Sequence, residues 1–143
     1  MNDRPMEYRR LEFVVSTDRG RLPPGQALEL LRATFWARDM PAEVLERALA
    51  NSVCFGLYHG DRLVGLGRAV SDLATYAYLT DIVVAESYRG KGLGEWLLQC
   101  ILDHPQLQGL RRIALLTRDA KNLYARNGFG PPPEHLSYME RRP

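Results

Sequence analysis

The chain has 143 residues, 45% of them hydrophobic and 25% charged, with a formal net charge of +2. This length suits one domain with a real core, so we expect a single domain over residues 1–143. The composition excludes a disordered chain, and the small, dispersed charge argues against nucleic-acid binding. We see no signal peptide, and no stretch reaches the ~20 apolar residues of a membrane span. We therefore expect a cytoplasmic protein with no membrane partner.

The metal and disulfide chemistry expected from this sequence is sparse. Cys54 and Cys100 each lie in an apolar run and form no CxxC pair. Buried free thiols in a reducing compartment are the simplest interpretation. His59, His104 and His135 are scattered in predicted turns without the spacing of metal ligands, so we expect no metal site.

Periodicity in the first 50 residues predicts one strand and two helices. Apolar residues at alternate positions from Leu11 predict one strand over residues 7–17. A helix is expected to begin at Pro24, which suits a first helical turn, and a second short helix at Pro41.

The rest of the chain alternates between strand-like and helix-like segments. The predicted mixture is one mixed sheet, mostly antiparallel, with helices on both faces, in the α/β (α+β) class. The expected elements are strands at residues 52–58, 63–71 and 76–84, a helix from 93 to before Pro105, a strand at 112–116, a helix from 120 and an edge strand at 136–140.

A glycine-rich loop between a buried strand and an amphipathic helix is the most informative segment. Its sequence, Arg89-Gly-Lys-Gly-Leu-Gly94, has a glycine at every second position, so the backbone can adopt positive φ and approach a ligand closely. Free N–H groups at the start of the helix, with the helix dipole, favour an anion there. The side chains of Arg89 and Lys91 add positive charge. The loop therefore predicts a phosphate-binding cradle.

Three families of phosphate loop compete for this segment. A P-loop requires Ser or Thr after the lysine, and a Rossmann loop requires GxGxxG, where this chain has Glu95 in place of the third glycine. The loop resembles instead the pyrophosphate loop of the GCN5-related N-acetyltransferase (GNAT) family, Gln/Arg-x-x-Gly-x-Gly/Ala, which Arg89, Gly92 and Gly94 match. A glycine-rich turn without a ligand is the other interpretation.

A second segment resembles the same family. The sequence from Ala120 to Phe129, AKNLYARNGF, is similar to the family's A-x-x-L-Y-x-x-x-G-F pattern and follows the loop after one helix and one strand. The resemblance implies a GNAT-like sheet that splays between its fourth and fifth strands. It also implies acetyl-CoA as the acyl donor, without a metal.

The resemblance assigns cofactor contacts residue by residue. The pantetheine arm is expected along Ile82, Val83 and Val84. Thr117 stands where the family often has a cofactor-binding asparagine; because threonine is shorter, it either makes that contact or only caps the next helix. The pyrophosphate is expected on Arg89, Gly90, Lys91, Gly92, Leu93 and Gly94.

Acetyl transfer to an amine needs an acid for the leaving thiolate and a way to remove the amine's proton. Tyr124 resembles the family's tyrosine acid; alternatively it is a half-buried core residue. Asp81 lies in an apolar strand, where alternation places it on the face of Leu79 and Val83. It is a candidate base or anchor for the amine, or else a carboxylate satisfied by an arginine or a backbone N–H. Glu86 is a weaker candidate.

Acceptor sites in the family are often lined by the connection between the first two helices. That stretch carries aromatics and both signs of charge, although its aromatics could equally pack in the core. The candidate acceptor contacts are Phe35, Trp36, Arg38 and Asp39.

The sequence thus predicts an N-acyltransferase that transfers an acetyl group from acetyl-CoA to a primary amine by direct attack in a ternary complex. The alternative is a non-catalytic acyl-CoA-binding module on the same fold. Because the chain is compact, a small-molecule acceptor is favoured over a protein. We expect no nucleic-acid partner, and a monomer or a homodimer.

Overall fold

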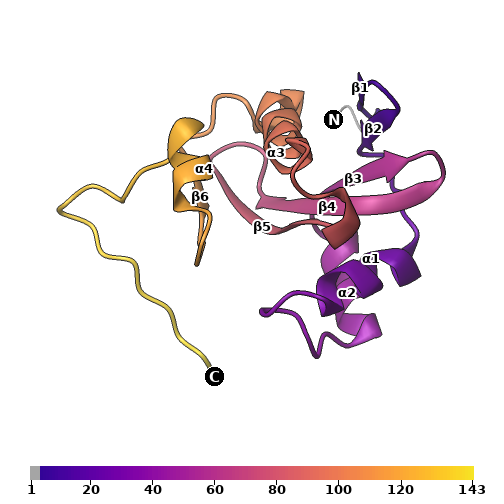
Figure 1. Ribbon diagram of the computed structural model, residues 1–143. Coiled ribbons are helices and arrows are strands. Elements are labelled where there is room, and N and C mark those ends of the chain that lie inside the picture. Colours follow the sequence, from indigo (N-terminus) through magenta and orange to yellow (C-terminus); the bar gives the residue numbers. More distant parts are fainter. Residues whose placement is uncertain (1–3) are drawn as a thin grey trace.

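A computed structural model describes residues 4–143 of the protein, and these form one sheet with helices on both of its faces (Figure 1). The strands are β1 (Glu7–Arg10), β2 (Phe13–Ser16), β3 (Val53–His59), β4 (Arg62–Ser71), β5 (Tyr76–Val84) and β6 (Arg112–Leu115). The helices are α1 (Pro24–Arg32), α2 (Ala42–Ala50), α3 (Leu93–Asp103) and α4 (Lys121–Arg126), with 3-10 turns at Glu86–Tyr88 and Pro105–Leu107.

The strands follow one another across the sheet in chain order, β1-β2-β3-β4-β5-β6. Each neighbouring pair is antiparallel except β5 and β6, which are parallel and joined through α3. The predicted class, a mostly antiparallel mixed sheet with helices on both faces, is therefore confirmed. No helix within residues 4–143 is long and apolar enough to cross a membrane.

Two apolar cores lie on the two faces of the sheet. The amphipathic helix α3 buries Leu97, Leu98 and Ile101 against one face, together with Phe55 and Leu79. On the other face α1 and α2 pack over β3 to β5. Their buried side chains are Ala27, Leu31, Leu45 and Leu49, which meet Tyr58, Leu66 and Val83.

The sheet opens between β5 and β6, as predicted. The two strands pair only from Tyr76 with Arg112 to Leu79 with Leu115. Beyond that point β6 ends while β5 continues to Val84. The backbone groups of Thr80–Val84 on this side therefore have no strand partner within the described residues. Apart from the Val84 carbonyl, which accepts a hydrogen bond from Arg89, this leaves them available to a ligand.

A β-bulge at Asp81 changes which side chains face which core. Arg68 pairs with Thr80 and Leu66 with Val83, so Asp81 and Ile82 together lie opposite a single residue of β4. Asp81 is left-handed, with φ of 56°. The expectation that Asp81 shares a face with Leu79 was wrong. The extra residue shifts the alternation, so Asp81 and Val83 lie on the face covered by α1, opposite the face on which Leu79 packs.

The single strand expected over residues 7–17 is a hairpin. Arg10 pairs with Phe13, so Leu11 and Glu12 form a two-residue turn. Leu11 takes a left-handed φ of 55° and is 91% exposed. The reversal lets β1 pair with β2, and Tyr8 of β1 packs against the same core as Phe13 and Val15 of β2.

The edge strand expected at residues 136–140 is absent, and the chain beyond Phe129 contains no helix or strand. It leaves the body as an extended tail, drawn in yellow at the end of the ribbon in Figure 1. Without a neighbouring strand, its backbone has no ladder to join. The predicted end of the last helix is confirmed, because α4 ends at Arg126 and Gly128 adopts a left-handed φ of 93° just beyond the cap residue Asn127.

Candidate active site

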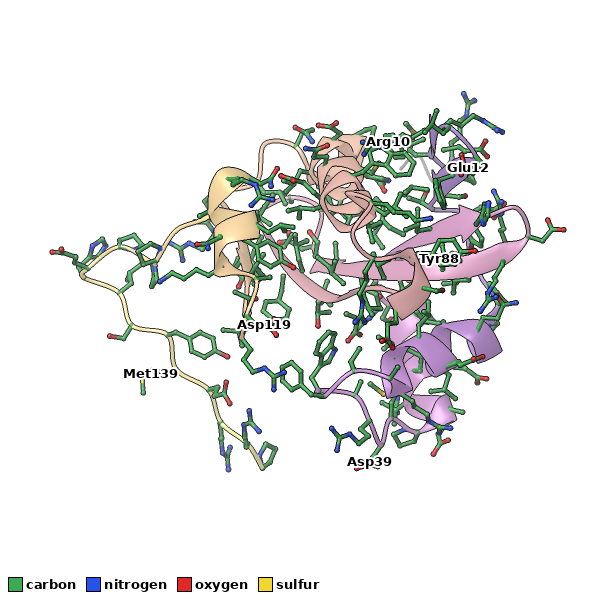
Figure 2. The ribbon with its side chains drawn as sticks, in the orientation of Figure 1. Arg10, Glu12, Asp39, Tyr88, Asp119 and Met139 are labelled. Atoms are coloured by element: carbon green, nitrogen blue, oxygen red, sulfur yellow. The ribbon has the colours of Figure 1, made fainter. Side chains whose placement is uncertain are left out.

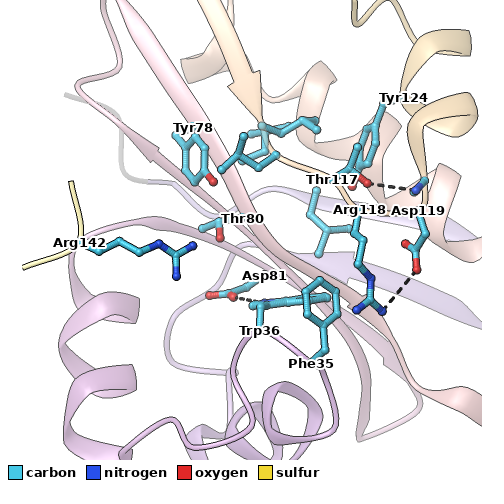
Figure 3. A pocket seen from close by; sticks show the side chains of 15 residues that line it. Phe35, Trp36, Tyr78, Thr80, Asp81, Thr117, Arg118, Asp119, Tyr124 and Arg142 are labelled. Carbon is cyan, nitrogen blue, oxygen red and sulfur yellow. Dashed lines mark hydrogen bonds and ion pairs between the residues drawn. The ribbon is translucent and has the colours of Figure 1, made fainter. Parts of the chain in front are cut away.

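A pocket of about 510 Å³ opens where β5 and β6 separate (Figure 3). Its walls come from β5, from the β6–α4 connection, from α4 and from the α1–α2 connection. Residues distant in sequence thus converge at the splay. The predicted site residues that line this pocket are Phe35, Trp36, Asp81, Ile82, Thr117 and Tyr124.

The aromatic pair of the α1–α2 connection forms one wall. Phe35 and Trp36 pack edge to face, with their ring centroids 5.1 Å apart, and each is 47% exposed. The Arg118 guanidinium lies 3.6 Å from the centroid of the Phe35 ring, close enough for a cation–π contact that links this wall to the β6–α4 connection. Arg38 and Asp39 are exposed and do not line the pocket; Asp39 lies at the outer margin of the molecule (Figure 2).

Asp81 is a buried carboxylate with both oxygens engaged. Its Oδ2 accepts from Arg68 Nε at 2.9 Å and from Arg68 Nη2 at 2.8 Å. Its Oδ1 accepts from Trp36 Nε1 at 2.8 Å. Arg68 continues the network by donating from Nη1 to the Ser52 hydroxyl at 3.2 Å. This is the arrangement of a carboxylate satisfied by an arginine, which the sequence left as one of two interpretations.

Tyr124 projects from α4 toward the pocket (Figure 3). Its ring packs edge to face with Phe129, with centroids 5.8 Å apart. Burial raises the pKa of the Tyr124 hydroxyl above its usual value of 10.0. The hydroxyl therefore stays protonated at neutral pH, the state that a proton donor requires.

Thr117 lies on the β6–α4 connection and lines the same pocket. Its hydroxyl accepts a hydrogen bond of 3.1 Å from the Ala120 N–H, just before α4 begins. The side chain thus organises the start of α4, which carries Tyr124. This contact matches the capping role considered for Thr117 and is compatible with a ligand on its exposed side.

The glycine-rich loop has the backbone that was predicted from its sequence. Gly90 and Gly92 adopt φ of 79° and 75°, and a Cβ at either position would meet nothing within 4 Å. The first bond into α3 runs from Trp96 N–H to the Gly92 carbonyl, so the N–H groups before Trp96 have no acceptor in the helix. These features suit a pyrophosphate, although the loop lies outside the lining of the 510 Å³ pocket.

The two cations of the loop behave differently. Arg89 folds back and donates from Nε to the Val84 carbonyl at 2.9 Å, which fixes the loop to the end of β5. Lys91 lies with its Nζ 5.6 Å from the ring centroid of Tyr88. The Tyr88 hydroxyl is 2.8 Å from His59 Nδ1, so the loop is also tied to the β3–β4 hairpin.

Nine of the fifteen residues that line the pocket were not predicted, among them Tyr78, Arg118 and Arg142. Arg68 was not predicted either; it does not line the pocket but pairs with Asp81, which does. For Arg68 a signal was present, since an arginine in an otherwise apolar strand needs a buried partner. Arg142 gave none, because its approach depends on the path of the tail. Within the described part of the chain, no group of three or more His, Cys, Asp or Glu side chains could hold a metal ion.

Comparison with known proteins agrees with this architecture. Residues 25–129 match the model of the acetyltransferase (GNAT) family. A protein of Gibberella zeae named as an acetyltransferase is 35% identical over 87% of this chain and 82% of its own length. A crystal structure from Xanthomonas campestris, assigned to the GNAT family, is 44% identical with a TM-score of 0.86, and the match covers 91% of this chain and 92% of that one.

A more distant structure, a GNAT family acetyltransferase of Elizabethkingia anophelis with acetyl-CoA bound, shares the fold. Its TM-score is 0.66 at 17% identity, over 85% of this chain and 78% of that one. Together with the 44% identical structure, the family model places this fold in the class of acetyltransferases. With the family match covering more than half of its length, this chain belongs to the GNAT family of acetyltransferases.

Proposed function

We propose that the protein transfers an acetyl group from acetyl-CoA to a primary amine, by direct attack within a ternary complex. The observation that carries the proposal is the pocket at the splay, where Tyr124 faces the aromatic wall of Phe35 and Trp36. One side of the splay offers unpaired β5 backbone and the other offers a protonated hydroxyl. This combination fits a thioester that lies along β5 and an amine that enters against the aromatic wall.

The donor is proposed to lie along the open side of β5, with its pantetheine arm on the backbone of Ile82, Val83 and Val84. Its pyrophosphate would meet the N–H groups of the loop and of the first turn of α3, with the positive side chains of Arg89 and Lys91 nearby. The bound acetyl-CoA of the Elizabethkingia anophelis relative supports this donor for the fold.

In the reaction the amine nitrogen attacks the thioester carbonyl, so that a C–N bond forms and the C–S bond breaks. Tyr124 is proposed to protonate the departing sulfur. Both oxygens of Asp81 already accept hydrogen bonds, Oδ1 from Trp36 and Oδ2 from Arg68, which supports a structural role for this carboxylate. We therefore assign to Asp81 the role of positioning Trp36, and we propose that water takes the proton from the amine. Glu86 is exposed and outside the pocket lining, which makes it a poor base.

The acceptor is proposed to be a small molecule that packs against Phe35 and Trp36. The pocket volume of about 510 Å³ lies within the range of small-ligand sites. Trp36→Ala should raise the KM for the acceptor without weakening acetyl-CoA binding. Arg38→Ala, an exposed neighbour outside the lining, serves as the control and should leave both unchanged.

A thiol-release assay with acetyl-CoA against pooled amines, amino acids, polyamines, aminoglycosides and peptides tests the activity. Release of CoA that depends on one acceptor, with the acetylated product seen by mass spectrometry, supports the proposal. Tight CoA binding without turnover on any pool would support the non-catalytic module instead.

Donor binding is tested separately by calorimetry with CoA. Gly92→Glu places a carboxylate in the proposed pyrophosphate cradle and should weaken binding by at least about tenfold. Gly109→Glu is a matched control, because Gly109 also has positive φ, 73°, and open space around it. If the two variants bind CoA with equal affinity, the loop is not part of the donor site.

A further inference from the structure

We propose that the acceptor is an α-amino acid with an apolar side chain, and that its carboxylate binds between Arg142 of the C-terminal tail and the hydroxyl groups of Tyr78 and Thr80 on β5. The inference rests on the proposed acetyl transfer, because it names the class of acceptor for the same pocket. None of these three residues is among those proposed to hold the donor. The carboxylate site therefore belongs to the acceptor side alone.

The C-terminal tail lies against the body of its own copy and brings a cation to the pocket. Tyr138 and Glu140 both interact electrostatically with Tyr78 of β5. Two residues farther along, Arg142 lines the pocket together with Tyr78 and Thr80. Figure 3 shows the Arg142 side chain reaching into the pocket from the side on which these two residues lie. The end of the chain therefore takes part in the pocket at the splay.

Contacts within the tail orient Arg142 and leave one edge of its guanidinium open. Its Nε donates to Glu140 Oε2 at 2.6 Å, and Oε1 of the same carboxylate accepts from the Tyr138 hydroxyl at 2.8 Å. The two Nη groups of Arg142 have no hydrogen-bond partner within residues 4–143. Such a planar fork matches the two oxygens of a carboxylate. Because Glu140 already offsets part of its charge, Arg142 suits a singly charged carboxylate better than a doubly charged phosphate.

Tyr78 and Thr80 add two hydroxyl groups on the same side of the sheet as the aromatic wall. They alternate along β5 with Leu79, which packs in the core beneath α3, so their side chains point to the opposite face. Neither hydroxyl has a hydrogen-bond partner within the described residues, although both residues line the pocket. Burial above all raises the pKa of Tyr78 above its usual 10.0, so its hydroxyl stays protonated at neutral pH. Both hydroxyls can therefore donate to a carboxylate, which makes a strong hydrogen bond.

The two acidic residues that line the pocket do not oppose a carboxylate at this place. Asp81 is paired with Arg68 at 2.8 Å. Asp119 has Arg118 as its partner at 3.8 Å, and in Figure 3 this pair lies on the other side of the pocket from Arg142. A carboxylate beside Arg142 therefore meets no unpaired negative charge among the residues that line the pocket.

An α-amino acid suits this pocket because three different groups diverge from its Cα atom. The carboxylate meets Arg142, the apolar side chain packs against Phe35 and Trp36, and the amine is directed toward the donor and Tyr124. All of these residues line the one pocket of about 510 Å³. Apolar walls with a few polar groups that fix the orientation of the ligand are typical of small-molecule sites. Three fixed contacts around one carbon also distinguish mirror images, so the site should prefer one enantiomer.

Thiol-release kinetics on matched pairs test the carboxylate site. Each pair joins an amino acid to the amine that lacks its carboxylate, such as phenylalanine with phenethylamine and leucine with 3-methylbutylamine. Arg142→Ala should lower the ratio of kcat/KM within a pair about ten- to hundredfold, mainly by raising the KM for the amino acid. The comparison between proteins cancels the different basicity of the two amines. Arg141→Ala, an exposed neighbour outside the lining, is the control and should keep the ratio. An unchanged ratio in Arg142→Ala overturns the inference.

Binding separates this inference from the proposed reaction. Phenylalanine and phenethylamine are titrated by calorimetry into the full chain with CoA present. Phenylalanine should bind at least about tenfold more tightly, and Arg142→Ala should abolish the difference. If that result is obtained but no amine is acetylated, the carboxylate site stands and only the proposed reaction fails. If amines are acetylated but the two ligands bind equally, or neither binds, the reaction stands and the carboxylate site is refuted.

Discussion

Trp36 donates a hydrogen bond of 2.8 Å from its indole nitrogen to Asp81 Oδ1, although the two residues lie 45 positions apart. One comes from the α1–α2 connection and the other from the bulge in β5. The bond fixes the aromatic wall of the pocket to the strand that is proposed to hold the donor. The geometry of the proposed acceptor side therefore depends on a carboxylate that is itself held by Arg68.

Asp81→Asn should destabilise the protein by about 3 kcal/mol. The substitution leaves the Arg68 guanidinium, which is almost buried, without its counter-charge. Asparagine tolerates the left-handed backbone at this position, so the loss of stability measures the removal of the negative charge and not backbone strain. Denaturant unfolding of Asp81→Asn, Arg68→Met and the double variant should give a coupling energy of about 1–3 kcal/mol.

Asp119→Asn is the matched control, since Asp119 lines the same pocket but is exposed and lies 3.8 Å from its arginine partner. Its stability should change by less than about 0.5 kcal/mol. If Asp81→Asn instead keeps the stability of the unmodified protein and loses turnover mainly at low pH, Asp81 is the base and the positioning role is wrong.

Because of His104, the free energy of unfolding should decrease when the pH is lowered. Burial lowers the pKa of its imidazole below the usual 6.5. The unfolded chain then binds more protons than the folded chain once the pH falls below about 6.5, so the free energy of unfolding decreases there. His104→Asn keeps an acceptor for the Gln106 N–H, which His104 Nδ1 provides at 3.1 Å.

The measurement is the free energy of unfolding between pH 8 and pH 5. His104→Asn should lose less of it on acidification than the unmodified protein does. His135→Asn, in the exposed tail, should follow the unmodified curve. Parallel curves for all the proteins would show that His104 is not the group that titrates.

The order of elements and the backbone of the glycine-rich loop could be predicted because both depend on local pattern. Gly90 and Gly92 occupy positions of positive φ, which glycine adopts at little cost, and the amphipathic period of α3 is visible directly. Proline and glycine mark the start of α1 and the end of α4 in the same local way.

The parts that failed depend on pairing between distant segments. One extra residue in β5 turned Asp81 to the other face, and no periodicity shows such a bulge. The partner of Asp81 was foreseen as a type of residue but not as Arg68, because the register of β4 against β5 decides it. The alternating pattern at residues 136–140 forms no strand, because a strand needs a neighbour to pair with and local pattern does not show one.

Gly94→Ala should separate stability from donor binding. Gly94 is the second residue of α3 and has no positive φ, and a Cβ there would lie 3.8 Å from the Val84 side chain, an ordinary contact. Alanine should therefore stabilise the helix by about 0.5–1 kcal/mol. If pyrophosphate approaches this turn closely, the added methyl group should weaken CoA binding by about tenfold.

Gly25→Ala is the matched control, because Gly25 is the second residue of α1 with open space around it. It should raise the melting temperature similarly and leave CoA affinity unchanged in calorimetry. A Gly94→Ala protein that binds CoA as tightly as the Gly25→Ala protein would show that the ligand does not approach this turn.

Tyr124→Phe should lower kcat by about 10²–10⁴-fold while the Kd for acetyl-CoA stays within about twofold, because only the proton donor is removed. The ring and its packing against Phe129 remain, so the melting temperature should change little. Since burial raises the pKa of Tyr124 above 10.0, the hydroxyl is protonated throughout the neutral range, and loss of activity through its ionisation should appear only above about pH 10.

Tyr76→Phe, on the exposed end of β5 and outside the pocket lining, is the control and should keep full turnover. Equal kcat for the two variants, once an acceptor is known, would leave Tyr124 with a packing role only.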